Sequence, residues 1–115
     1  MADCIFCEIA AGNVPSRTVY EDDHVRAFHD LNPVAPVHVL LIPKAHVSGV
    51  SALSDDHVDT MGRLLVAART VARELDIEDS GYRLVINDGR DACQTVFHLH
   101  LHLLGGRNMP WPPYA

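Results

Sequence analysis

The sequence predicts one α+β domain, in which an antiparallel five-stranded meander sheet carries one long helix on one face. Three observations support this class. Short strand-like segments follow one another along the chain, one long segment with helical periodicity interrupts them, and a short helical segment precedes them. The chain has 115 residues, of which 48% are hydrophobic and 21% charged. Those values are normal for a folded protein, so we expect a single domain over 1–115.

The five predicted strands are short, rich in aliphatic residues and bounded by turn residues. They cover 18–21, 24–28, 37–42, 82–87 and 96–104. Asp22-Asp23 joins the first two as a hairpin, and Pro43 ends the third. Prolines place 31–36 in a loop and exclude a helix or a central strand from the tail 109–114.

Two helices are predicted. Asp3 caps a short helix over 4–11, which Gly12 ends, and Ser54-Asp55-Asp56 begins the main helix over 55–75. The apolar stripe of the main helix is expected to pack on the sheet. It consists of Val58, Met61, Leu65, Ala68, Ala72 and Leu75.

The composition argues against several functions. A formal net charge of −6 argues against broad electrostatic binding to nucleic acid or to membranes. No apolar stretch approaches the roughly 20 residues of a spanning helix, and the first residues lack the pattern of a signal peptide. We therefore expect a cytoplasmic protein.

Three histidines alternate with leucines in the run 96–104. Residues two apart on a strand share a face, so His98, His100 and His102 are expected on one face and the leucines on the other. Such a strand usually has water on its polar side, but water does not require three histidines. The row therefore indicates a metal site, a catalytic face, or both.

Cys4 and Cys7 form a C-x-x-C pair with no strand before it, which favours metal ligation over redox chemistry. Either the histidine row binds a metal by itself, or one of its members joins the cysteines. The outer histidines would be about 13–14 Å apart at Cα, which is awkward for one ion about 2 Å from each nitrogen. We therefore prefer Zn²⁺ held by Cys4, Cys7, His46 and His98. The alternative for His46 is an exposed loop histidine.

Several segments, in the same order, resemble the histidine-triad (HIT) superfamily over nearly the whole chain. His98-Leu99-His100-Leu101-His102-Leu103-Leu104 matches the triad signature. The other matching segments are Asp3-Cys4-Ile5-Phe6-Cys7, Phe28-His29-Asp30-Leu31-Asn32-Pro33, Leu41-Ile42-Pro43-Lys44-Ala45-His46 and Val85-Ile86-Asn87-Asp88-Gly89. The tail from Gly105 to Pro113 is similar to that of the Hint branch, the purine nucleoside phosphoramidases, although Pro110 stands where relatives often carry histidine.

The resemblance implies a HIT-like homodimer in which the two sheets join and the tail, with Trp111, approaches the partner's active site. It implies a purine nucleotide bound at its α-phosphate. It also implies structural zinc held by the C-x-x-C pair, a histidine at the position of His46 and the first triad histidine, which agrees with the ligand set above.

The resemblance further implies that His100 attacks phosphorus, because the middle histidine does so in the family. A neutral imidazole needs no deprotonation to attack, and a backbone carbonyl is expected to fix its tautomer. His102 would donate to a phosphate oxygen, and Thr95 matches a serine that assists the leaving amine. With His98 these residues form the expected catalytic set. His38 is expected either to support His100 or to be a buried structural residue.

Further matched positions imply contacts with the nucleotide. Asp30 would accept from the ribose hydroxyls, Asn87 and Gln94 would meet the phosphate, and Phe28 and Leu31 would flank the base. The full set of expected nucleotide contacts is Phe28, Asp30, Leu31, Asn87, Gln94, Thr95, His100, His102 and Trp111.

The expected activity is hydrolysis of nucleoside 5′-phosphoramidates. Two alternatives stay open. One is a dinucleoside polyphosphate hydrolase or a nucleotidyl transferase that uses the same triad, and the other is a nucleotide-binding regulatory module.

Overall fold

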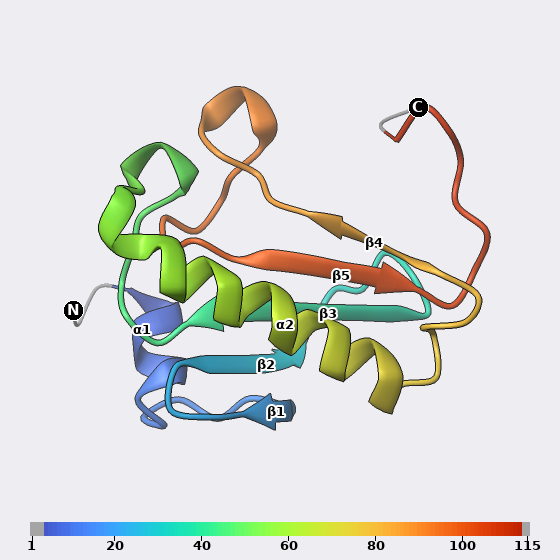
Figure 1. The fold of residues 1–115 in the computed structure, drawn as a ribbon, viewed down its shortest axis with the longest axis horizontal. Helices are drawn as coiled ribbons and strands as arrows, with labels where there is room; N and C mark the ends of the chain where they lie inside the picture. Colours follow the sequence, from blue (N-terminus) through green and yellow to red (C-terminus); the bar gives the residue numbers. More distant parts are fainter. Residues whose placement is uncertain (1–3, 114–115) are drawn as a thin grey trace.

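Five antiparallel strands form the central sheet of the molecule (Figure 1), and the computed structural model describes residues 4–113. The strands are β1 (Thr18–Glu21), β2 (Val25–His29), β3 (Val37–Pro43), β4 (Tyr82–Val85) and β5 (Leu101–Gly105). The helices are α1 (Ile5–Ala10) and α2 (Val58–Glu74), and short 3₁₀ turns cover Val50–Ala52, Asp55–His57 and Arg90–Ala92. The predicted α+β class is confirmed, as are the five strands, the long helix and the short N-terminal helix.

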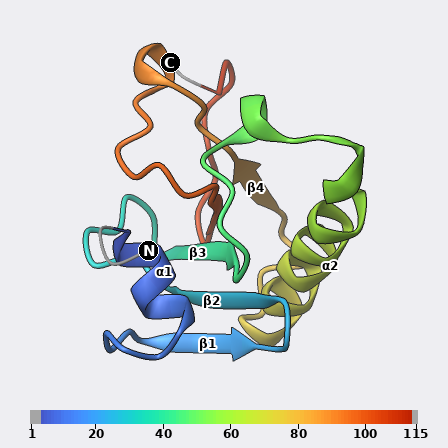
Figure 2. The same ribbon diagram turned by 90° about the vertical axis from the view of Figure 1, so that its left-hand side faces the viewer.

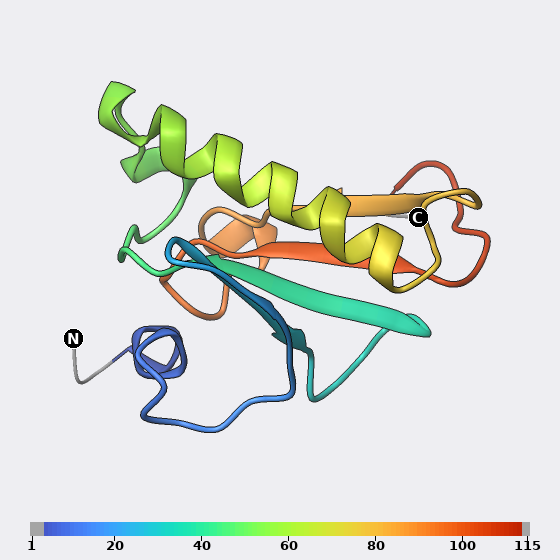
Figure 3. The ribbon, with the colours of Figure 1, turned by 60° about the horizontal axis from the view of Figure 1, so that its bottom comes forward.

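The two helices lie on opposite faces of the sheet (Figures 2 and 3). One core fills the space between α2 and the sheet, and a second lies between α1 and the other face. The second core consists of Phe6, Ile9, Phe28, Leu40 and Ile42. Because both faces are covered, β3 is buried at every position after its first residue.

The strand order is β1-β2-β3-β5-β4, so the prediction of a simple meander is wrong. The long connection through α2 crosses the sheet and delivers β4 two positions from β3, at the edge of the sheet (Figure 1). β5 then returns between them and pairs antiparallel with both. β4 is therefore an edge strand.

The histidine strand is shorter than predicted. Ladder pairing begins at Leu101, opposite Leu41, and the residues before it make no strand pairs. The alternation continues nevertheless, because Leu99 lies in the core under α2 together with Leu101. The expected water on the histidine face is also absent: His98 is 0% and His100 6% exposed, since α1 covers that face.

The main helix confirms its predicted location and most of its predicted core face: Ala68 and Ala72 are buried, and Met61 and Leu75 pack against the core. Ser54 caps the 3₁₀ turn that leads into α2. The buried residues of α2 are Leu64, Ala67, Ala68, Val71 and Ala72. Val58 and Leu65, which were expected in the core, are exposed. Leu64, next to Leu65 in the chain, is the buried leucine instead.

The start of α1 differs slightly from the prediction. Cys4 is the N-cap of α1, with its Sγ accepting from the Cys7 backbone N–H at 3.3 Å, and the predicted cap Asp3 lies outside the described residues. Between residues 4 and 113, no helix is both long enough and apolar enough to cross a membrane.

Candidate functional site

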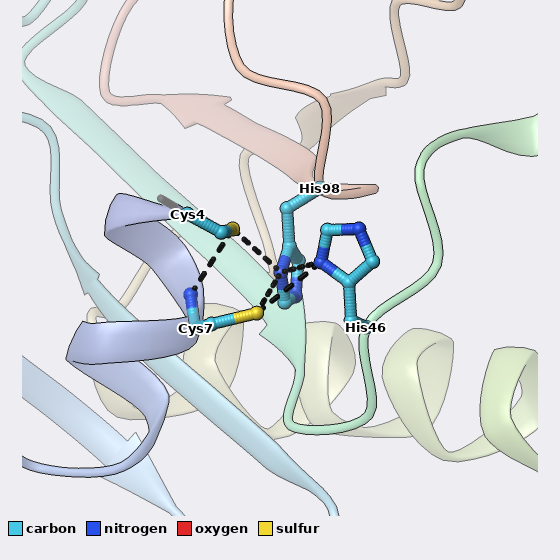
Figure 4. A group of neighbouring side chains, drawn as sticks. All are labelled: Cys4, Cys7, His46 and His98. Atoms are coloured by element: carbon cyan, nitrogen blue, oxygen red, sulfur yellow. Dashed lines mark hydrogen bonds between the residues drawn. The ribbon is translucent and has the colours of Figure 1, made fainter. Parts of the chain in front are cut away.

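Four side chains from three segments converge at one end of α1 (Figure 4). Cys4 and Cys7 come from α1, His46 from the loop after β3, and His98 from the segment before β5. The His98 Nδ1 atom lies 3.4 Å from the Cys4 Sγ, 3.5 Å from the Cys7 Sγ and 3.2 Å from the His46 Nδ1. The His46 Nδ1 lies 3.2 Å from the Cys7 Sγ. This is the set that the spacing favoured, and His100 and His102 lie outside it.

The geometry of this cluster fits a metal ion. Ligand atoms around a tetrahedral ion with bonds of about 2.0–2.3 Å are about 3.3–3.8 Å apart, and the four distances here are 3.2–3.5 Å. The His98 Nε2–H donates to the Pro43 carbonyl at 2.8 Å, which leaves the Nδ1 lone pair facing the cluster. Burial lowers the pKa of His98 and so favours the neutral form that binds metals. These four residues could therefore hold a cation.

The backbone fixes the tautomer of the His100 ring. Its Nδ1–H donates to the His98 carbonyl at 2.8 Å, which confirms the expected carbonyl contact. The Nε2 atom of the neutral ring therefore carries the free lone pair. The edge of Phe6 packs against this ring, with centroids 5.1 Å apart and planes at 85°.

His38 contacts His102 rather than His100, so the expected support of His100 is wrong and the alternative, a buried structural residue, is confirmed. The His38 Nδ1 accepts from the Val34 backbone N–H at 3.1 Å, which leaves Nε2 as its donor in the neutral ring. That Nε2 lies 2.9 Å from the His102 Nδ1 and 3.4 Å from the Asp30 Oδ2. Asp30, His38 and His102 are close enough to ligate an ion, but these hydrogen bonds already pair them.

Both rings of this pair are held neutral. Burial lowers the pKa of His38, against an opposing effect of the Asp30 carboxylate. Burial, followed by the neighbouring His100 and His38, lowers the pKa of His102 to about 4. A neutral His102 whose Nδ1 accepts a hydrogen bond carries its own hydrogen on Nε2. His102 is therefore a neutral donor.

A cavity of about 300 Å³ lies beside these rings. Its apolar walls include Phe6, Ile9, Phe28 and Leu40, and its polar lining includes Arg17, Asp30, Thr95, His100 and His102. A larger cavity of about 560 Å³ lies between the start of β4 and the tail, but no histidine lines it. We assign the site to the smaller cavity, because it alone of these two joins an apolar slot to a poised imidazole.

Of the other expected nucleotide contacts, one lines the cavity and three lie outside its lining. Leu31 lines the cavity although it is 85% exposed. Gln94 is buried, with its amide nitrogen donating to Ser48 and Val96 and its oxygen accepting from Gly89. Its side chain thus braces the loop, in contrast to the implied phosphate contact. Asn87 and Trp111 are outside the cavity lining, and Trp111 is 82% exposed.

The sequence reasoning missed some residues that shape this site. The C-x-x-C pattern gives no role to Phe6, yet its ring packs against His98, His100 and Phe28. The backbone partners at Val34 and Pro43 leave no signal in residue type. Cys93 is exposed, in a left-handed conformation with φ +62°.

The fold and the site together define a small α+β protein with a row of three histidines. His98 belongs to a cluster of two cysteines and two histidines, and His100 and His102 line the adjoining cavity. A family model described as HIT domain matches residues 11–109. The chain is 50% identical over 113 residues to a 14 kDa zinc-binding protein of Brassica juncea, covering 96% of this chain and 99% of that protein. It is 49% identical over 111 residues to adenylylsulfatase HINT1 of Arabidopsis thaliana, covering 95% and 75%.

A solved structure gives the same answer. The crystal structure of a HIT family hydrolase from Legionella pneumophila matches with a TM-score of 0.94 at 43% identity, over 96% of this chain and 99% of that one. The chain therefore belongs to the HIT domain family, in agreement with its triad signature, and its similar relatives include Hint-like proteins.

Proposed function

We propose that this protein hydrolyses nucleoside 5′-phosphoramidates, such as AMP-linked amines, through a covalent nucleotidyl intermediate on His100. The hydrogen bond from the His100 Nδ1–H to the His98 carbonyl carries this proposal, because it directs the lone pair of Nε2 into the cavity. Nε2 attacks the α-phosphorus, the P–N bond breaks, and the amine leaves with a proton taken from solvent through the Thr95 hydroxyl. Water then attacks phosphorus, the P–Nε2 bond breaks, and AMP, neutral His100 and the proton lost by the water are released.

The other residues take roles around this reaction. The Nε2–H of His102 donates to a phosphate oxygen as negative charge builds, and His98 supplies the carbonyl that orients the nucleophile. The Thr95 hydroxyl lies at the cavity and assists the leaving amine. Asn87 lies outside the cavity lining and takes no part in this step, while Gln94 holds the loop that carries Thr95.

The substrate's nucleoside half would occupy the apolar side of the cavity. Phe28 is buried in the wall and Leu31 projects at the rim, so the two side chains would hold a purine ring between them. Asp30 offers a carboxylate to the ribose hydroxyls. Arg17 adds positive charge to the lining, which suits a phosphorylated ligand.

A second candidate substrate is adenylyl sulfate, because the similar Arabidopsis protein is named an adenylylsulfatase. The same attack by His100 would release sulfate in place of an amine. Sulfate is a weak base and leaves without a proton, so this reaction needs less help from Thr95. A dinucleoside polyphosphate hydrolase or a nucleotidyl transferase would share the covalent step and differ in the leaving or accepting group.

We also propose that the cluster of Cys4, Cys7, His46 and His98 holds a structural Zn²⁺. Two thiolates and two imidazoles fill a tetrahedral ion and leave no open position for substrate. The name of the similar Brassica protein supports zinc among the cations that the donor set fits. This metal would stabilise the arrangement of the site without taking part in bond breaking.

We further propose a homodimer built on β4 and α2. β4 is an edge strand with Leu84 exposed, and α2 exposes Leu65. Leu65 lies about 200° around α2 from Arg63, which faces β1 in a shared cavity, so it projects toward the β4 side. Sedimentation of the wild type should give a dimer, and Leu84→Asp should give a monomer. A monomeric wild type would contradict this assembly.

The activity is tested by offering an AMP–amine phosphoramidate, adenylyl sulfate and a diadenosine polyphosphate at equal concentrations. We expect the phosphoramidate to be preferred, and we expect His100→Ala to lose at least roughly 10³-fold in kcat. The variant should still bind AMP and retain its metal. A preference for another substrate would move the protein to that reaction, and full activity in His100→Ala would remove the nucleophile. Binding of nucleotides without any turnover would favour the regulatory module.

A further inference from the structure

The short helix α1 contributes to both the candidate metal centre and the nucleotide cavity. Cys4 and Cys7 direct their sulfurs at His98 and His46 (Figure 4). Phe6 and Ile9 are the buried residues of the same helix and line the cavity. Residues of the metal cluster and residues of the cavity wall thus alternate along the same short helix.

Phe6 stands at the junction of these two sites. Its ring packs edge-on against three other aromatic rings: His98 at 6.1 Å, His100 at 5.1 Å and Phe28 at 5.7 Å between centroids. It is 7% exposed. The contact with His100 blocks rotation of the imidazole away from the His98 carbonyl, and the contact with Phe28 completes the apolar wall.

α1 has little to hold it in place other than this cluster and its small apolar face. A helix of six residues is far below the length at which helices persist alone in water. Arg26 donates to the carbonyl of Ile9 at its C-terminal end, and the Cys4 sulfur caps its N-terminal end. A metal bound to Cys4 and Cys7 would join both thiolates to His46 and His98, and would therefore fix α1 against the histidine segment.

We propose that Phe6 is a positioning residue through which metal occupancy of the cluster controls nucleotide affinity and the orientation of His100. The inference rests on the zinc site and the nucleotide cavity of the proposed function. When the cluster is loaded, α1 holds Phe6 on the His100 ring. When the metal is lost, α1 loosens, the apolar wall recedes and His100 gains rotational freedom.

The test is AMP binding by the full chain, with and without Zn²⁺, under reducing conditions. Metal removal should raise the Kd for AMP about tenfold. It should also speed hydrogen exchange of the amides of 5–10 while those of α2 stay protected. In Phe6→Ala the Kd should already be raised, and metal removal should add little, because the two changes act through one contact.

Two further variants separate positioning from simple packing. Phe6→Leu keeps an apolar wall but loses the aromatic edge on His100, so it should bind AMP almost normally while kcat falls. Val14→Ala removes a side chain that packs on the same apolar cluster outside the cavity lining, and its response to metal should match that of the wild type.

Several outcomes would overturn the proposal: no bound metal, an unchanged Kd after metal removal, or a loss of protection in α2 as large as that in 5–10. Additive effects of Phe6→Ala and metal removal would also overturn it. If AMP binding depends on metal as described but phosphoramidates are not hydrolysed, then the reaction assignment fails and the coupling stands.

Discussion

The Nε2 of His38 lies 2.9 Å from the Nδ1 of His102, and the backbone fixes the direction of this hydrogen bond. The amide of Val34 donates to the other nitrogen of His38, so His38 must donate and His102 must accept. This order places the hydrogen of His102 on its Nε2. A residue on β3 thereby sets the tautomer of a residue on β5.

Replacing His38 with phenylalanine should release this constraint. Without a donor at its Nδ1, His102 gains access to the tautomer in which Nε2 is an acceptor and repels phosphate oxygens. We expect kcat for the phosphoramidate to fall roughly 10²-fold, as for loss of one transition-state donor. His38→Gln offers an amide donor and should restore part of the rate. Nitrogen NMR of the His102 ring reports the tautomer directly, and an unchanged tautomer in His38→Phe would contradict the assignment.

The His102 ring should also make the protein less stable as the pH is lowered. The folded pKa of His102 is about 4, below its ordinary value of 6.5. Between these values the unfolded chain binds a proton that the native chain does not, so stability is full above about pH 6.5 and is lost as pH falls toward 4. This contribution is about 3 kcal/mol by the size of the shift. The lowered pKa of His38 acts in the same direction.

Urea unfolding at pH 7 and pH 4.5 measures this effect. The loss on acidification should be smaller in His102→Asn than in the wild type, and loss of metal is common to both proteins. His24→Asn, a change at an exposed histidine, is the matched control and should follow the wild type. Equal losses in His102→Asn and the wild type would contradict the lowered pKa.

The local sequence pattern predicted the strands, the helices and the alternation of side chains. It did not predict features that depend on contacts between residues far apart in the chain. Leu99 and His100 face opposite sides because backbone alternation is local, and it persists even where β5 has not begun to pair. The order of β4 and β5 depends on where a long connection crosses the sheet, which no residue pattern records. In α2, Leu64 is buried and its neighbour Leu65 is exposed, and hydrophobicity alone does not distinguish these two leucines.

In the candidate site, too, some residues could be predicted from the sequence and others could not. The triad and the C-x-x-C pair are visible in residue type and spacing, so Cys4, Cys7 and His98 could be proposed together. The partner of His38 depends on which ring lies opposite it across two paired strands. The side chain of Gln94 binds backbone groups of three loop residues, and such contacts become apparent only when the loops are folded.

The metal centre predicts a clear contrast between two cysteines. Cys4→Ser removes a ligand, so it should lower metal content and reduce the Tm by roughly 10 °C or more, since structural zinc sites contribute on the order of 10 kcal/mol. Cys93→Ser changes an exposed cysteine outside the cluster and should leave both unchanged. A chelator should lower the Tm of the wild type and of Cys93→Ser but not that of Cys4→Ser. Equal metal content in all three proteins would refute the ligand set.

Thr95 distinguishes the candidate substrates by what the leaving group requires. An amine is a poor leaving group until it gains a proton, so Thr95→Ala should slow phosphoramidate hydrolysis by roughly 10²-fold, within the range of general acid catalysis. Sulfate leaves as a stable anion, and hydrolysis of adenylyl sulfate by the same variant should change little. Thr95→Ser keeps the hydroxyl and should retain the amine reaction, while Thr95→Val keeps the shape and should lose it. Equal loss on both substrates would show that Thr95 positions the phosphate and not the leaving group.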